Sequence, residues 1–90
     1  MRIRFSEEGK STLHSLHIAI QRKVKEALKR LANGEVKGKA LTAQLTGFWT
    51  LIVDNHRIIY QNKSQEIIVN RVGHRSTVYS SVLTNKMLEE

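Results

Sequence analysis

The chain of 90 residues carries 15 Lys and Arg against 8 Asp and Glu, a formal net charge of +7, and no cysteine. It therefore offers neither a disulfide framework nor a thiolate metal site, and its natural partners are polyanions, of which nucleic acid fits best. Because no run of residues approaches a membrane span and residues 1–10 have no apolar signal region, we expect one cytoplasmic domain over residues 1–90, without membrane contact.

The first 34 residues predict a strand followed by helices. Residues 1–5, MRIRF, alternate apolar and basic side chains, which indicates a strand at a sheet edge or beside the last strand. Ser6 supplies a helix N-cap, and the two glutamates after it lie where the helix dipole favours negative charge. The Asn-Gly pair at residues 33–34 is a helix stop.

Between these limits the apolar residues recur at helical spacing. They are Leu13, Leu16, Ile20, Val24, Ala27, Leu28 and Leu31. The spacing predicts an amphipathic segment over the core, formed by one helix or by two. We favour two helices, a helical hairpin, because the β-branched and histidine-containing residues 17–19 can carry a tight break.

Residues 34–47 connect this segment to the strongest β-hairpin signal in the chain. In the linker, Lys37 and Lys39 flank a glycine and form a basic loop that either contacts phosphate or is simply solvated. Residues 48–53 are mainly aromatic and β-branched, Asp54-Asn55 is a two-residue turn, and residues 56–61 resume the strand pattern. A third strand over residues 66–72 follows a polar turn at residues 62–65.

The period of two in a strand assigns these residues to two faces of the sheet. Pairing Gln61 with Glu66 gives an apolar first face: Trp49, Leu51, Val53, Ile58, Tyr60, Ile67 and Val69. We call the second the open face and expect it to carry Thr50, Arg57, Asn70 and His74, with the apolar Ile52, Ile59, Ile68 and Val72 exposed. Arg75 and Tyr79 lie just beyond its end, whereas Arg71 and His56 fall on or near the first face. Ser76-Thr77 can cap a short C-terminal helix through Val78, Tyr79, Val82, Leu83 and Met87, which completes an α+β domain.

The open face suits phosphodiester chemistry better than hydrolysis of other kinds. The chain has no Walker loop, dinucleotide fingerprint, HExxH motif or GxSxG elbow, and His14 and His17 lack the further ligands that a metal needs, so we expect no metal and no cofactor. Cleavage of RNA by its own 2′-hydroxyl needs a proton acceptor, a donor for the 5′-oxygen, and cations for the charge on phosphorus. Histidine, arginine and a stacking tyrosine fit these roles, unless they serve only the structure of a basic protein.

The segments LTGFWTLIVDNHRIIYQ and IIVNRVGHRSTVY resemble the RelE/ParE superfamily of bacterial toxins. The resemblance implies an antiparallel sheet of about four strands with the helical hairpin on one face, and a toxin held inactive by a cognate antitoxin. In the RelE branch it implies an mRNA interferase, which cleaves mRNA in the ribosome without metal and arrests translation and growth. Arg57 matches the hairpin arginine, Arg75 the basic position after the glycine, and Tyr79 the C-terminal aromatic.

His74 falls where a basic residue is also common, and we assign it provisionally as the general base. To RNA binding we assign Lys37, Lys39, Thr50, Asn70 and Arg71. Thr50 and Ile52 stand where some RelE members have lysines. The ParE branch, which poisons DNA gyrase and lacks the nuclease residues, is the first alternative, and a non-toxic relative that only binds its antitoxin is the second.

Overall fold

A computed structural model describes residues 1–80 and has the expected α+β class. Its elements are β1 (Arg2–Phe5), α1 (Glu7–His14), α2 (Ile18–Ala32), β2 (Lys39–Ala40), the short 3-10 helix η1 (Ala43–Leu45), β3 (Trp49–Val53), β4 (His56–Lys63) and β5 (Glu66–His74). A helical turn begins at Val78. The remainder of the predicted C-terminal helix, with Val82, Leu83 and Met87, lies outside the described residues.

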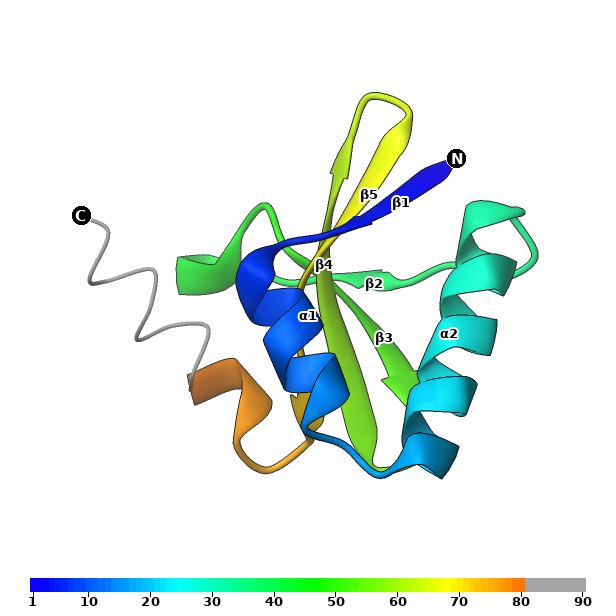
Figure 1. The fold of residues 1–90 in the computed structure, drawn as a ribbon. Helices are drawn as coiled ribbons and strands as arrows, with labels where there is room; N and C mark the ends of the chain where they lie inside the picture. Colours follow the sequence, from blue (N-terminus) through cyan, green and yellow to red (C-terminus); the bar gives the residue numbers. More distant parts are fainter. Residues whose placement is uncertain (81–90) are drawn as a thin grey trace.

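The strands form one sheet in the order β1-β5-β4-β3-β2 (Figure 1). Strands β3, β4 and β5 form the predicted antiparallel meander. β1 lies at the edge beside β5, as expected, but it runs parallel to β5. Two residues of the predicted linker form β2 against β3, so the sheet is mixed and has five strands instead of about four antiparallel ones.

The two helices cover one face of the sheet, which confirms the helical hairpin (Figure 1). Ser6 caps α1 as predicted, because its Oγ accepts a hydrogen bond from the Gly9 backbone N–H at 3.0 Å. His17 starts the second helix, since its Nδ1 accepts from the Ala19 N–H at 3.1 Å. The break therefore falls between His14 and Ile18, close to residues 17–19.

The main core lies between the helices and the first face of the sheet. Its buried residues are Leu13, Val24, Leu28, Val53, Ile58, Tyr60, Ile67, Val69 and Val72. Trp49 and Leu51 pack against them, so every residue predicted for the first face is in this core. Val72 also belongs to this core, although the predicted register placed it on the open face.

The pairing of β4 with β5 differs from the predicted register. Lys63, and not Gln61, lies opposite Glu66, because the strands continue through polar residues to a tighter turn at residues 64–65. This shift of two residues keeps Ile67 and Val69 on the core face. A β-bulge then inserts Asn70 between two consecutive pairs of the ladder, Ile59 with Arg71 and Tyr60 with Val69. Beyond the bulge every residue of β5 is on the face opposite to the predicted one.

The apolar residues predicted to be exposed on the open face are mostly buried. Ile59 forms a second, smaller core with Val78, against which Leu41, Leu45, Phe48 and Tyr79 pack. Ile68 is also buried, and Val72 turns to the helices because of the bulge. Ile52 alone among the four remains 64% exposed.

The helix α1 lies along the part of the β5 edge that β1 leaves unpaired. β1 ends opposite Val69, and the Val72 N–H then donates to Thr12 Oγ1 at 3.0 Å. Ser6 N and Ser6 Oγ donate to the Val69 carbonyl at 3.0 and 3.1 Å. Ser6 and Thr12 thus satisfy backbone groups at the β5 edge that would otherwise need a sixth strand as their partner.

We predict that Gly9→Ala destabilises the protein by about 1–3 kcal/mol, although alanine is the better helix former. A Cβ at Gly9 would overlap the Val69 carbonyl oxygen and lie 3.0 Å from the Val69 carbonyl carbon. Denaturant unfolding measures the change, with the exposed Ser11→Ala in the same helix as control. A Gly9→Ala protein as stable as Ser11→Ala would contradict the close approach of α1 to β5.

The free energy of unfolding should also fall at alkaline pH because of Tyr60. Burial raises the pKa of the Tyr60 phenol above its usual value of 10.0, and a hydrogen bond from the Gly38 backbone offsets this only in part. The folded state therefore favours the neutral phenol, so its stabilisation is complete below about pH 10 and is lost as the pH rises through the folded pKa. Between pH 9 and pH 11, the free energy of unfolding should fall more in the wild type than in Tyr60→Phe, as measured by denaturant unfolding at each pH. If the free energies of the two proteins fell in parallel, the raised pKa of Tyr60 would be refuted.

Candidate functional site

The C-terminal turn folds back over the open face and brings Tyr79 to Thr50. Tyr79 Oη and Thr50 Oγ1 share a hydrogen bond of 3.3 Å. The buried Val78 side chain holds the turn in place, because it packs on Ile59. Val78 also lies close to Gly73: a Cβ atom added to Gly73 would be only 3.3 Å from the Val78 Cβ. The predicted neighbours Thr50 and Tyr79 are therefore in contact.

Arg57 lies on the open face, as predicted, where it pairs with Ile52 of β3 and Gly73 of β5. Its Nη1 donates to two backbone carbonyls, those of Asp54 at 3.3 Å and His56 at 3.1 Å. No ion pair within residues 1–80 involves Arg57. Its positive charge is thus positioned by neutral groups and available to an anion.

Arg75 follows β5 at the same end of the sheet as Arg57. Its backbone N–H donates to the Asn55 carbonyl at 2.8 Å, which ties the C-terminal turn to the β3–β4 turn. The Arg75 side chain is exposed, and within the described part of the chain it takes part in no ion pair. Two arginines without acidic partners therefore flank one end of the open face.

His74 is not on the open face, contrary to the prediction, because the bulge places it opposite His56 on the helix-covered side. The two rings are edge to face, with centroids 5.7 Å apart. His74 Nδ1 accepts from the Ser76 backbone N–H at 3.2 Å and lies 2.8 Å from Ser76 Oγ. Since a backbone N–H only donates, the neutral imidazole carries its proton on Nε2.

Arg71 and Asn70 also differ from their predicted positions. Arg71 lies opposite Ile59 on the open face, where its Nη2 forms an ion pair with Glu8 Oε1 of α1. Burial lowers the pKa of the Arg71 guanidinium. Asn70 is the bulged residue, and within the described residues its Oδ1 is buried without a hydrogen bond. Neither side chain is as free for RNA as the sequence suggested.

Only one of the two predicted lysines lies on this face. Lys39 is exposed in β2 opposite Thr50, and cross-strand partners share a face, so it lies beside the Thr50–Tyr79 pair. Lys37 is exposed in the loop before β2, near Trp49 and Tyr60 of the helix-covered face. Lys39 and Arg57 thus add positive charge along β3 and β4.

No group of three or more His, Cys, Asp or Glu within residues 1–80 is placed to hold a metal. His14 ends α1 and His17 caps α2, so the two histidines belong to different helices. Within the same residues, no helix has the length and apolar character needed to span a membrane.

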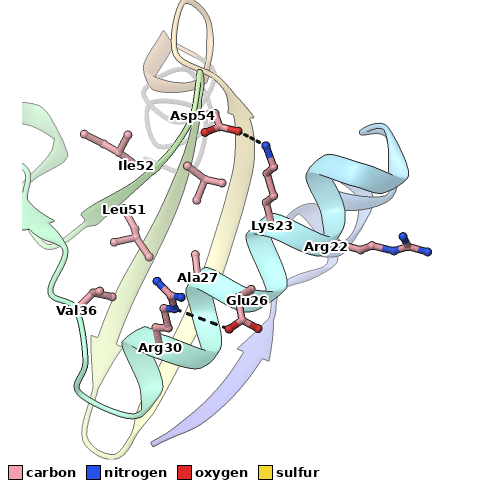
Figure 2. Close-up of a pocket in the computed structure, with 10 residues that line it drawn as sticks. Arg22, Lys23, Glu26, Ala27, Arg30, Val36, Leu51, Ile52 and Asp54 are labelled. Atoms are coloured by element: carbon pink, nitrogen blue, oxygen red, sulfur yellow. Dashed lines mark hydrogen bonds and ion pairs between the residues drawn. The ribbon is translucent and has the colours of Figure 1, made fainter.

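A groove of about 510 Å³ between α2 and β3 was missed by the sequence analysis (Figure 2). Apolar side chains of Ala27, Val36, Leu51, Ile52 and Val53 line it together with Arg22, Lys23, Glu26, Arg30 and Asp54. Two exposed ion pairs lie at its rim, Lys23 with Asp54 at 2.7 Å and Arg30 with Glu26 at 3.8 Å. The hydrogen bond from Lys23 and its charge hold the pKa of the Asp54 carboxyl below its usual value. The one sequence signal was Ile52, an apolar residue outside the predicted core.

The ion pair between Arg71 and Glu8 should contribute to stability, and Glu8→Gln tests this. The Arg71 side chain is only 20% exposed, so loss of its partner leaves a poorly solvated charge. Because the Glu8 side chain is 42% exposed, we expect a loss of about 1 kcal/mol, below the usual 1.5–3 kcal/mol for a charged hydrogen bond. Glu7→Gln removes the same charge from the same helical turn and is the matched control in denaturant melts. Equal losses for the two variants would show that only the helix dipole is involved.

The fold is similar to that of solved toxin structures. The chain is 27% identical to a chain of the RelBE2 toxin-antitoxin complex from Mycobacterium tuberculosis, with a TM-score of 0.74 over 82% of this chain and 96% of that one. Similarity in fold alone extends to the isolated RelE toxin of E. coli (19% identity, TM-score 0.70, covering 93% and 96% of the two chains) and to YafQ of E. coli (16%, 0.72, 88% and 99%). Comparison with curated protein sequences gives no match. The family model described as "ParE toxin of type II toxin-antitoxin system, parDE" matches residues 3–79, so the chain belongs to this family of toxins, within the RelE/ParE superfamily that its motifs resemble.

Proposed function

We propose that this toxin is a ribosome-dependent mRNA endoribonuclease of the RelE type, acting in the cytoplasm. The observation that carries the proposal is the pair of arginines, Arg57 and Arg75, at one end of the open face, neither with an acidic partner within residues 1–80. Tyr79 adds an aromatic ring on the same face, and Lys39 adds a further cation. A site of this composition suits a phosphate between unpaired bases.

In the proposed reaction, the 2′-oxygen attacks the adjacent phosphorus and the bond to the 5′-oxygen breaks. Arg57 and Arg75 stabilise the negative charge that develops on the phosphate oxygens. The Tyr79 ring, anchored through its hydroxyl to Thr50, stacks on a base beside the scissile bond.

His74 lies opposite His56 on the helix-covered side, away from Arg57, so we give it no part in the proton transfers of this proposal. A group outside this chain takes the 2′-proton, and another group outside this chain supplies the proton that the departing 5′-oxygen takes up. Such a division of roles is consistent with a reaction that requires the ribosome.

A cognate antitoxin is the proposed protein partner. Solved structures of this fold include toxin-antitoxin complexes, among them RelBE2 from Mycobacterium tuberculosis and RelB-RelE from Methanococcus jannaschii. A protein of charge +7 is suited to an acidic partner, which would bind the native state and stabilise it by mass action.

A gyrase inhibitor without nuclease activity is the second candidate, and the specific observation in its favour is the match to the ParE family model. The two candidates are separated by adding purified toxin to a translation extract and mapping mRNA ends, with a DNA gyrase supercoiling assay alongside. Cleavage only in the presence of ribosomes supports the first candidate. Loss of supercoiling with intact mRNA supports the second and refutes the nuclease proposal.

We predict that Arg57→Ala slows mRNA cleavage about 100- to 1000-fold, as loss of one preorganised donor typically does. Its stability should change little, because Arg57 is outside the main core and its hydrogen bonds are to carbonyls near the turn. Arg2→Ala, which removes the same charge from the exposed edge strand β1, is the matched control and should cleave normally. If Arg57→Ala cleaved at the wild-type rate with an unchanged melt, Arg57 would not belong to the site.

A further inference from the structure

Two residues of the proposed site, Arg75 and Tyr79, lie in the C-terminal turn that follows β5, drawn in orange in Figure 1. The pairing of the strands does not place them, because the ladder ends at His74. Their positions depend instead on the path of the chain after that residue. The path is fixed at Arg75 by the hydrogen bond of its N–H to the Asn55 carbonyl, and at Val78 by burial of the side chain.

His74 bonds to the two residues between these points. Its Nδ1 accepts from the Ser76 backbone N–H at 3.2 Å, and its carbonyl accepts from the Thr77 N–H at 3.1 Å. A side-chain acceptor for the N–H two residues further on is the arrangement by which asparagine and aspartate begin turns. His17 accepts in the same way from the Ala19 N–H at 3.1 Å, where α2 begins. Histidine therefore serves twice in this chain as a cap, and His74 caps the C-terminal turn.

The ring of His56 keeps the His74 ring in this arrangement. The two residues are cross-strand partners, and their rings meet edge to face with centroids 5.7 Å apart. Packing of this kind limits the rotamers of a side chain. The His74 ring is thus held on the helix-covered side, away from Arg57, with its Nδ1 at the Ser76 N–H.

We propose that His74 is a positioning residue, whose Nδ1 holds the C-terminal turn so that Arg75 and Tyr79 lie at the open face with Arg57. In this role His74 contacts no RNA and acts through the residues that do. The proposal rests on the mRNA endoribonuclease proposed above for what Arg75 and Tyr79 do, and it adds the group that places them. Because a misplacement of about 1 Å can slow a reaction about 100-fold, one hydrogen bond in the turn is enough to affect the rate.

Asparagine and glutamine at position 74 separate this role from a reaction of the imidazole itself. In His74→Asn, the side-chain Oδ1 is as many bonds from the backbone as Nδ1 of histidine, so it can accept from the Ser76 N–H. In His74→Gln the amide lies one bond further out, near the position of Nε2, and the cap is lost. Both variants lose the ring contact with His56 equally.

With ribosomes present, we expect His74→Asn to cleave mRNA within about threefold of the wild-type rate and His74→Gln to cleave about 10- to 100-fold more slowly. Equal losses in the two variants would show that the ring itself is required. Cleavage by His74→Gln at the wild-type rate would show that the cap is not required. Either result overturns the proposal.

His17→Gln is the matched control for the loss of a histidine cap. It removes the same kind of hydrogen bond from an exposed histidine at the start of α2, outside the C-terminal turn. Compared at equal amounts of folded protein, it should cleave mRNA at the wild-type rate. Equal slowing by His17→Gln and His74→Gln would trace the effect to a general loss of helix caps and contradict a role particular to His74.

Amide hydrogen exchange tests the turn without RNA, so this proposal and the nuclease function can fail separately. The Ser76 and Arg75 amides should exchange slowly in the wild type and in His74→Asn, and at least about tenfold faster in His74→Gln, because hydrogen bonds of the capped turn protect them. Unchanged exchange in His74→Gln would overturn the proposal whatever the cleavage rates. A wild-type protein that showed this exchange pattern but cleaved no mRNA would refute the nuclease function and leave His74 as the residue that places the turn.

Discussion

The pairing of β4 with β5, with its one extra residue at Asn70, decides which side chains share a face of the sheet. Before the bulge, Val69 faces the helices opposite Tyr60, and after it Val72 does so opposite Ile58. An uninterrupted ladder would turn Val72 to the open face. The bulge therefore keeps Ile67, Val69 and Val72 all on the core side, although the last two are three residues apart and the first two are two residues apart.

The same bulge distributes the polar residues of the site. It turns Arg71 to the open face, where Glu8 pairs with it, and turns His74 away to meet His56. Arg57 and Arg75, which form no ion pair within residues 1–80, lie at the far end of the sheet beside the β3–β4 turn. Because an unpaired guanidinium on a scaffold of neutral carbonyls is ready for an anion, the location of positive charge is set by which arginines the fold neutralises and not by their number.

Local patterns predicted much of the fold, since each depends on neighbouring residues alone. The Ser6 cap, the break near His17, the turn at Asp54 and the core face of β3 and β4 all follow from spacing and residue type. The bulge at Asn70 could not be predicted, because an inserted residue changes the parity of everything after it and has no local signature here. For this reason Arg57 and Thr50, which precede the bulge, were assigned to the correct face, and His74 and Arg71, which follow it, were not.

The groove escaped the sequence analysis for a different reason: it exists only because α2 and β3, distant in sequence, leave a gap that β2 is too short to fill. Its position also relates it to the open face. Ile52, which lines the groove, is the cross-strand partner of Arg57, so the groove adjoins the arginine end of the open face across the β3–β4 pair.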